Sequence, residues 1–251
     1  MKLRILPLAP GLIIALVLLL SAAPNELTAA EHSAGWKLLF DGDSTAAWRA
    51  FDRDTFPERG WVAMDGTLHC IASNGRPNGG GGDVITRELF TDFEFTWEWR
   101  MSPGGNSGVK YLIAPRAAGT KAMFAGDNGK AAVGFEYQLM DDLAHPDAKH
   151  GPIRTSGALY QLVAPRGKTL RPVGEWNVSR LIVRGPHVGH WLNGKKIVET
   201  ELSGPALQGA IAASKYAPVP RFGVKAPTAI LLQDHGDAVW FRSLKIRPLK
   251  P

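Results

Sequence analysis

One stretch in the middle of the chain alternates strictly between aromatic and polar side chains. Residues 93–100 read Phe-Glu-Phe-Thr-Trp-Glu-Trp-Arg, so an aromatic ring occupies every second position. Successive side chains of a β-strand point to opposite faces of the sheet. The segment therefore predicts a strand whose four rings face a core, with Glu98 and Arg100 on the other face. A chain with this segment is expected to fold around β-sheets.

The same period of two recurs along the rest of the chain. It is found in residues 135–140, 180–184 and 239–246. His190–Leu192 and Lys195–Val198 flank Asn193-Gly194, which is the strongest short signal for a β-hairpin. No apolar pattern of helical length follows the N-terminal segment. Many short strands separated by Gly, Pro and Asn predict an all-β domain: a sandwich, a jelly roll or a barrel.

The N-terminal segment is typical of a secretory signal peptide. Lys2 and Arg4 precede an apolar run at 11–20, and Thr28-Ala29-Ala30 offers small residues for cleavage. The run is shorter than the roughly 20 residues of a membrane-spanning helix. We therefore expect residues 1–30 to be removed, residues 31–251 to form one domain, and the protein to be periplasmic or extracellular with no stable membrane span.

Charge and cysteine content argue against a nucleic-acid-binding protein and against a fold held by internal disulfides. The chain has 29 Lys and Arg, 23 Asp and Glu, and a net charge of +6. Its basic residues are scattered, with no run longer than Lys195-Lys196, so nucleic-acid binding is not expected. The single cysteine, Cys70, has no partner for an internal disulfide and is predicted to be a packed thiol.

Polar residues on two predicted strands are the first candidates for chemistry. Glu136 and Gln138 share the face opposite Phe135, Tyr137 and Leu139, where they would form the floor of a polar groove. Lys110 should likewise point away from Val109 and Tyr111, where it would neutralise charge developing on a substrate oxygen. From the pattern alone, an exposed sheet face without function is an equally acceptable interpretation of Glu136 and Gln138, and an ordinary surface lysine is the preferred interpretation of Lys110.

Two loops are the second source of candidates. Asp141–Thr155 holds His145 and His150 among three aspartates, a mixture that suits Zn, Mn or Fe but is also typical of a solvated loop. Ser73–Asp83 is rich in glycine, yet it opens no helix, so dinucleotide binding is not expected. Irregular loops on a rigid sandwich are common places for function.

Single residues elsewhere add to the set. His235 lies in a turn between two predicted strands, where it would act as an acid or a base, or simply bond to Asp234. Arg87 follows the glycine-rich loop and would bind substrate oxygens. Trp191, like Trp61 and Trp176, would stack on a sugar ring or belong to the core. No GxSxG motif supports a serine hydrolase.

Eight short motifs, in order from about residue 35 to 247, resemble the 3-keto-disaccharide hydrolase family. They are GWKLLFDG at 35–42, GNSGVKY at 105–111, GFEYQ at 134–138, HPDAK at 145–149, GALY at 157–160, GEWN at 174–177, HWLNG at 190–194 and LQDHG at 232–236. The resemblance implies a concanavalin-like jelly-roll β-sandwich of two antiparallel sheets with a carbohydrate-binding face. It also implies action on glycosides already oxidised to a ketone at C3.

The implied chemistry assigns provisional roles to the candidates. A C3 ketone acidifies the C2 proton, so a base forms an enediolate, the C1–O bond breaks by β-elimination, and water then adds. His145 or Glu136 would be the base, and Lys110 with Arg87 would stabilise the enediolate. His235 would be an acid or a positioning group. Gln138, Trp191 and Asp141 would bind substrate, and any divalent metal would be held by Glu136 and His145.

Two alternative functions stay open at this point. A laminarinase-type glycosidase needs two carboxyl groups about 5 Å apart, whereas Glu136–Asp141 reads Glu-Tyr-Gln-Leu-Met-Asp and supplies one secure carboxylate. A non-catalytic carbohydrate-binding module would need no titratable cluster. The keto-sugar route also implies a partner oxidoreductase, a sugar 3-dehydrogenase, that prepares the substrate.

Overall fold

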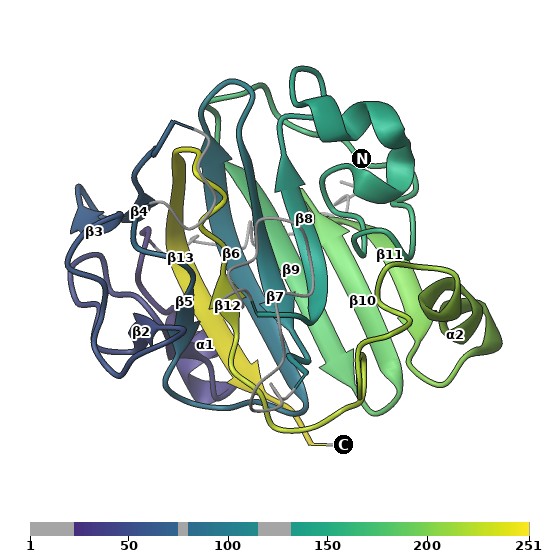
Figure 1. Ribbon diagram of the computed structural model, residues 1–251. Helices are drawn as coiled ribbons and strands as arrows, with labels where there is room; N and C mark the ends of the chain where they lie inside the picture. The colour runs from purple at the N-terminus through teal and green to yellow at the C-terminus, as the bar shows by residue number, and fades with distance from the viewer. Residues whose placement is uncertain (1–22, 75–79, 115–131, 251) are drawn as a thin grey trace, which may run out of the picture.

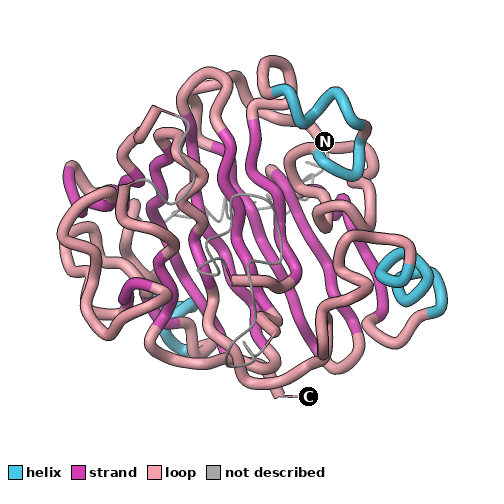
Figure 2. The backbone as a smooth tube through the Cα atoms, viewed as in Figure 1, coloured by secondary structure: helices cyan, strands magenta, loops and turns pink. Residues whose placement is uncertain are grey.

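The chain forms two antiparallel sheets stacked face to face (Figure 1). The structure is a computed structural model and describes residues 23–74, 80–114 and 132–250. Strands make up most of the regular structure in those residues, and the few helices lie at the periphery (Figure 2). Within the described residues, no helix is long and apolar enough to cross a membrane.

The larger sheet has eight strands. Seven follow one another in the order β11-β10-β9-β6-β13-β4-β3, and β1 pairs with the second half of β13. Their bounds are β1 Lys37–Leu38, β3 Trp61–Met64, β4 Thr67–Cys70, β6 Phe93–Met101, β9 Asn177–Arg184, β10 His187–Leu192, β11 Lys195–Glu201 and β13 Val239–Pro248.

The smaller sheet has five strands in the order β2-β5-β12-β7-β8. Their bounds are β2 Trp48–Ala50, β5 Val84–Thr86, β7 Asn106–Tyr111, β8 Phe135–Met140 and β12 Leu231–Leu232. The helices are α1 Ala29–Ser33, α2 Pro205–Ala212 and two short 3-10 helices, η1 Pro146–His150 and η2 Pro152–Arg154. Both 3-10 helices lie in the loop that follows β8.

The core lies between the sheets and is built from the alternating apolar residues. Phe95, Trp97 and Trp99 of β6 are at most 1% exposed. The Trp97 ring meets Tyr137 of the other sheet edge-on, with ring centroids 5.0 Å apart. Burial of several such rings is a large part of the hydrophobic stabilisation, at about 25 cal/mol per Å² of apolar surface. The predicted all-β sandwich of two antiparallel sheets is confirmed.

One histidine is part of this core. His190 of β10 is fully buried; its Nε2 lies 2.8 Å from the Tyr111 hydroxyl and its Nδ1 lies 3.0 Å from the carbonyl oxygen of Gly157. Burial lowers the pKa of His190 to about 4, so the ring is neutral at physiological pH. It connects the two sheets through hydrogen bonds and does not face solvent.

The local predictions from sequence are largely confirmed. The hairpin around Asn193-Gly194 forms between β10 and β11, and Cys70 is a buried free thiol. The helix α2 was not predicted, because eight residues give too short a pattern. Pro205 at its first position favours a helix start, and Leu207 is its one buried residue.

The N-terminal segment that precedes Glu31 contacts the domain. The strand β13 has an irregular register between Arg242 and Lys245. Asn25 is 8% exposed and binds this point: its Oδ1 accepts from Ser243 N at 2.8 Å, and its Nδ2 donates to the Gly66 carbonyl. Thr28 and Glu31 form a capping box at the start of α1. Cleavage after Ala30 would remove both Asn25 and Thr28.

Candidate active site

The outward face of the five-stranded sheet carries the polar floor predicted from the strand pattern. In the pairing of β7 with β8, Lys110 lies opposite Glu136, and Gly108 lies opposite Gln138. Tyr137, between the two polar residues of β8, belongs to the core. Glu136 and Lys110 therefore point away from the core, as predicted, and they are 8% and 7% exposed.

Gly108 provides the space that the Glu136 side chain occupies. A Cβ placed on Gly108 would overlap Oε1 of Glu136. The carboxylate therefore reaches from β8 over the backbone of β7. Lys110 is two residues further along the same face of β7, and its Nζ donates to the Ala132 carbonyl at 3.2 Å. The floor thus carries a glutamate and a lysine at paired positions of neighbouring strands.

Two loops bring a second group of residues to the end of this floor. His145 follows β8, and His235 and Asp237 follow β12; their potential ligand atoms lie within 4.8 Å of one another. The Asn106 amide nitrogen is 3.4 Å from Nε2 of His145 and 3.4 Å from Nε2 of His235. Gln138 Nε2 donates to Asn106 Oδ1 at 2.7 Å, which connects this cluster to the floor.

The two histidines differ in their surroundings. The backbone N–H of Asp147 donates to Nδ1 of His145 at 3.2 Å. The Asn106 amide nitrogen beside Nε2 is also a donor, because Asn106 Oδ1 accepts from Gln138, so each ring nitrogen of His145 lies beside an N–H group. Burial lowers the pKa of His235, although the Glu136 and Asp237 carboxylates act in the opposite direction. His235 is therefore neutral at neutral pH, so it can accept a proton or bind a metal.

The donor set of this cluster fits a divalent metal. Two imidazoles and one carboxylate are common ligands of zinc and of other transition metals. The sequence-based prediction placed any metal on Glu136 and His145, whereas the structure groups His145 with His235 and Asp237. Period-two spacing predicts which residues share a strand face, but it does not show which loops meet beyond the strand ends.

A wall of charged and aromatic side chains rises beside the floor. The Tyr160 hydroxyl donates to Asp147 Oδ2 at 2.7 Å, and Arg154 forms a 2.5 Å ion pair with Oδ1 of the same carboxylate. Lys215 Nζ lies 4.9 Å from the centre of the Tyr160 ring. Burial lowers the pKa of Lys215, and the charge of Glu136 opposes that shift, which places the ammonium within electrostatic reach of the floor.

A buried carboxylate lies on the other side of Lys110. Asp83 is 5% exposed, and its Oδ1 accepts from the backbone N–H of Asp234 at 3.0 Å. Burial raises the pKa of Asp83 to about 6, although the nearby charge of Lys110 lowers it. Asp234 in turn accepts from the N–H groups of Gly81, Gly82 and Gly236. The loop that carries His235 is therefore fixed to the glycine-rich loop.

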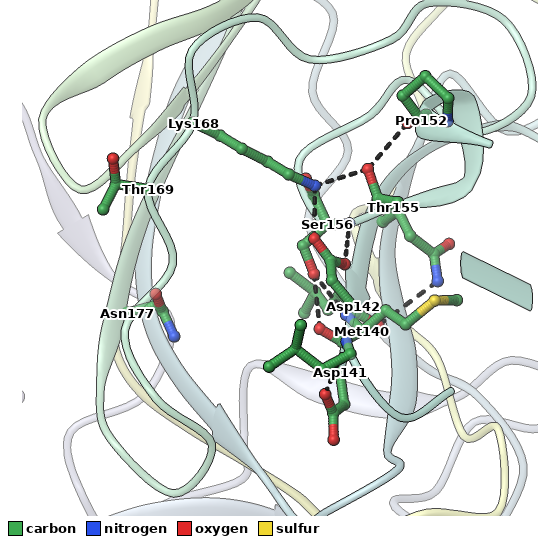
Figure 3. Close-up of polar contacts among 12 residues, drawn as sticks. Met140, Asp141, Asp142, Pro152, Thr155, Ser156, Lys168, Thr169 and Asn177 are labelled. Carbon is green, nitrogen blue, oxygen red and sulfur yellow. Dashed lines mark hydrogen bonds and ion pairs between the residues drawn. The ribbon is translucent and has the colours of Figure 1, made fainter. Parts of the chain in front are cut away.

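The loop that carries His145 is fixed through Lys168 (Figure 3). Lys168 Nζ donates to Asp142 Oδ2 and to Thr155 Oγ1, both at 2.5 Å, and to the Ser156 carbonyl at 3.0 Å. Asp141, predicted to bind substrate, uses its carboxylate within the loop. It accepts from the backbone N–H groups of Gly104, Leu143 and Ala144. Both aspartates hold the loop in place.

Two predicted substrate-binding residues lie away from this group. Arg87 donates to the carbonyl oxygens of Ala46 and Asp54. Trp191 lies on the eight-stranded sheet, with the Arg180 guanidinium 4.9 Å from its ring centre. The structure thus brings Glu136, Lys110, Gln138, His145 and His235 together at one site, and it places Asp141 in the supporting loop.

Some site residues were not selected from the sequence. Alternation along β7 could have identified Asn106, because Asn106, Gly108 and Lys110 occupy alternate positions on one face of the strand. Asp237 follows His235 at the same spacing of two. Lys215 carries no local signal, because it comes from a loop after α2 that only the folded chain brings to the floor.

The comparisons with known proteins show the family of the chain. Residues 35–247 match the sequence model of a family described as a 3-keto-alpha-glucoside-1,2-lyase-like domain. A 3-keto-disaccharide hydrolase of Bacteroides thetaiotaomicron is 32% identical over 237 residues, which cover 86% of this chain and 79% of the relative.

Solved structures from Parabacteroides distasonis share the fold. One, described as a "putative glycosyl hydrolase", has a TM-score of 0.77 and 28% identity, with 91% of this chain and 100% of that chain covered. A second with the same description has a TM-score of 0.63 and 25% identity, with 85% and 99% covered.

Proposed function

Because the chain belongs to the family of 3-keto-alpha-glucoside-1,2-lyase-like domains, we propose that it cleaves the glycosidic bond of 3-keto-glycosides, including 3-keto-disaccharides. The observation that carries the proposal is the Glu136–Lys110 pair on the floor, beside the cluster of His145, His235 and Asp237. It supplies a base, a positive charge and a proton donor on one face.

The first step removes the proton at C2 of the keto sugar. Glu136 is the base in our proposal, since its carboxylate lies over Gly108 with no side chain beneath it. The electron pair of the C–H bond moves toward the C3 oxygen and gives an enediolate. Lys110 on the floor and Lys215 at the wall provide positive charge for that oxygen, which is the interaction that strengthens as charge develops.

The second step breaks the bond between C1 and the leaving oxygen. The enediolate electrons re-form the C3 ketone and a C1=C2 double bond, and the leaving oxygen takes a proton. His145 is the proton donor in our proposal, because its imidazole lies at the end of the floor and an imidazolium can give a proton to the leaving oxygen. Water then adds across the double bond, so the net reaction is hydrolysis.

A divalent metal would be held by His145, His235 and Asp237. It would supply a Lewis-acidic positive charge near a substrate oxygen. A metal on His145 would occupy a ring nitrogen, so the donor role assigned to His145 applies to the metal-free site, whereas the role of Glu136 as base is the same in both.

Turnover of a 3-keto disaccharide beside its unoxidised parent tests the reaction, with deuterium exchange at C2 followed in parallel. We expect cleavage of the keto sugar alone, with exchange at C2. The substitution Glu136→Gln should lower kcat by at least about 100-fold and abolish exchange. The matched control Glu199→Gln changes an exposed residue of β11 and should leave both unchanged.

The other candidate functions give different results in the same assay. Cleavage of the parent sugar would favour a two-carboxylate glycosidase, for which Asp141 is poorly placed because its carboxylate accepts three backbone N–H groups. Binding without any cleavage would favour a carbohydrate-binding module.

A metal requirement is tested by chelation and by elemental analysis of the purified protein. We expect His145→Ala to lose any bound metal together with activity. The control His150→Ala alters an exposed histidine at the end of the 3-10 helix that follows His145 and should keep both. Equal metal content in the two variants would exclude His145 as a ligand.

Export and the source of the substrate complete the proposal. The apolar run at 11–20 and the small residues at 28–30 support secretion to the periplasm or beyond. The substrate carries a ketone at C3, so an oxidoreductase of the sugar 3-dehydrogenase class must produce it.

A further inference from the structure

We propose that a pocket at the β2 edge of the five-stranded sheet binds the leaving-group sugar of a keto-disaccharide. This inference rests on the proposed function and adds to it a subsite that determines which leaving groups are preferred. The pocket has a volume of about 390 Å³, which is within the range of small-molecule sites. It lies between the loop after β2 and the glycine-rich loop before β5.

The pocket is next to the catalytic floor. Leu231 of β12 pairs with Lys110 on one side and with Ile85 of β5 on the other. Neighbouring strands are about 4.8 Å apart, so β5 lies roughly 10 Å from β7. Asp83, which lines the pocket, immediately precedes β5 and is within electrostatic reach of Lys110 and Glu136. The distance suits two linked sugar rings, with the keto ring at Lys110.

The lining has the chemistry that binds a neutral sugar. Arg53, Glu58 and Arg59 are exposed, and their charged groups can donate to or accept from several hydroxyls. Phe51 lines the same pocket and packs against the apolar cluster that contains Ile85 and Leu231. A half-buried aromatic ring beside charged groups provides both an apolar face and hydrogen-bonding groups.

The first of the two loops around the pocket is held by specific contacts. Arg87 Nη2 donates to the Asp54 carbonyl at 2.7 Å, and Arg49 Nη1 donates to the Arg53 carbonyl at 3.3 Å. Arg87, predicted from sequence to bind substrate, thus positions the loop that lines this pocket.

The described end of the glycine-rich loop, residues 80–83, is fixed from two sides. A Cβ on Gly81 would overlap the Arg59 carbonyl, so the two backbones are in direct contact. The Gly81 and Gly82 N–H groups donate to Asp234, which is adjacent to His235. The pocket floor and the loop that carries His235 are therefore one connected unit.

Two substrates that share the keto sugar and differ in the leaving group test the subsite. One is a 3-keto disaccharide, whose leaving group is a sugar. The other is the methyl 3-keto-glucoside, whose leaving group is methanol. We expect wild-type kcat/KM to be higher for the disaccharide, because only its second ring reaches the pocket.

The variant Arg59→Ala removes one charged donor from the pocket. We expect it to lower kcat/KM for the disaccharide by about tenfold, which is the order of one hydrogen bond to a charged group. Its activity on the methyl glycoside should be unchanged, which also shows that the variant is folded. The control Arg184→Ala changes an exposed arginine of β9 and should affect neither substrate.

The two substrates distinguish a failure of the subsite proposal from a failure of the proposed reaction. A selective loss on the disaccharide supports the subsite. Equal losses on both substrates, or no loss on either, overturn the subsite while the proposed reaction stands. A wild-type protein that cleaves neither substrate overturns the proposed function and the subsite together.

Discussion

At the scale of single residues, the site depends on a missing side chain and on one buried charge. Glu136 occupies the space above Gly108, and Asp83 keeps a buried carboxylate beside the polar floor. Burial of a carboxylate costs free energy, and it raises the pKa of Asp83 to about 6. Both arrangements are consistent with residues placed for chemistry, and each can be tested with one substitution.

The substitution Gly108→Ala should displace the Glu136 carboxylate. The new methyl group would overlap Oε1, so the side chain must rotate away from its position over β7. We expect kcat on the keto sugar to fall by about 100-fold, as for other misplaced catalytic groups. In the control Gly209→Ala, the added Cβ meets nothing within 4 Å, and activity should be unchanged. Full activity of Gly108→Ala would remove Glu136 as the base.

The substitution Asp83→Asn should alter the pH dependence of stability. The pKa of Asp83 is raised to about 6 in the folded state, from 3.8. The contribution of the Asp83 carboxyl to the free energy of unfolding is fully present below pH 3.8. It is lost as pH rises through about 6. The change that Asp83→Asn makes in the free energy of unfolding should therefore be more stabilising at pH 7.5 than at pH 4, by at most about 3 kcal/mol.

Thermal denaturation at both pH values measures this effect. Asp43→Asn, which changes an exposed aspartate, is the control. The interpretation fails if Asp83→Asn has the same effect on Tm at pH 4 and at pH 7.5.

At the scale of elements, the floor comes from a sheet face and the histidine cluster comes from loops beyond strand ends. The floor lies on β7 and β8, whereas His145, His235 and Asp237 lie in loops that follow β8 and β12. Loops of this length need their own support. Lys168 supplies it for the loop of 141–156, and Asp234 supplies it for the loop of 233–237.

The substitution Lys168→Met should loosen the His145 loop. Methionine keeps the apolar stem but removes the ion pair with Asp142 and the bonds to Thr155 and Ser156. Because Asp142 is then left without its cation, we expect a loss of about 1–3 kcal/mol and a lower Tm. Amide hydrogen exchange should become faster in residues 141–156. Lys149→Met, at an exposed position of the same loop, is the control, and equal exchange in both variants would contradict this role.

At the scale of the whole molecule, segments from the two ends of the chain stabilise each other. Asn25 binds the irregular point of β13, and Glu31 forms an ion pair with Lys245 of the same strand. These contacts join segments more than 200 residues apart in sequence. They also bear on the predicted cleavage after Ala30, since a chain that starts at Glu31 keeps the ion pair but loses Asn25.

A chain that begins at Ala23 should be more stable than one that begins at Glu31. The longer chain keeps the Asn25 bonds and the Thr28 cap, which together contribute about 2 kcal/mol. For a domain of this size, that corresponds to roughly 4–8 °C in Tm. Glu26→Ala in the longer chain changes an exposed residue and serves as the control. Equal Tm values for the two chains would show that residues 23–30 contribute nothing.

Local pattern is enough to predict the strands, their faces and the fold class of this protein. Alternation is a property of neighbouring residues, so the sequence places Phe95, Trp97 and Tyr137 in the core, and Glu136 and Lys110 on the opposite face. The order of the short motifs indicates the family. Residue type also selects His145 and His235, because it limits what chemistry a side chain can perform.

Which loops meet, and what each polar side chain contacts, follows from the tertiary structure alone. It groups His145 with His235 and Asp237, brings Lys215 to the floor, and commits Asp141 to its own loop. These contacts join residues far apart in the chain, and they depend on how the two sheets stack and where the loops cross. No local pattern in the sequence encodes that geometry.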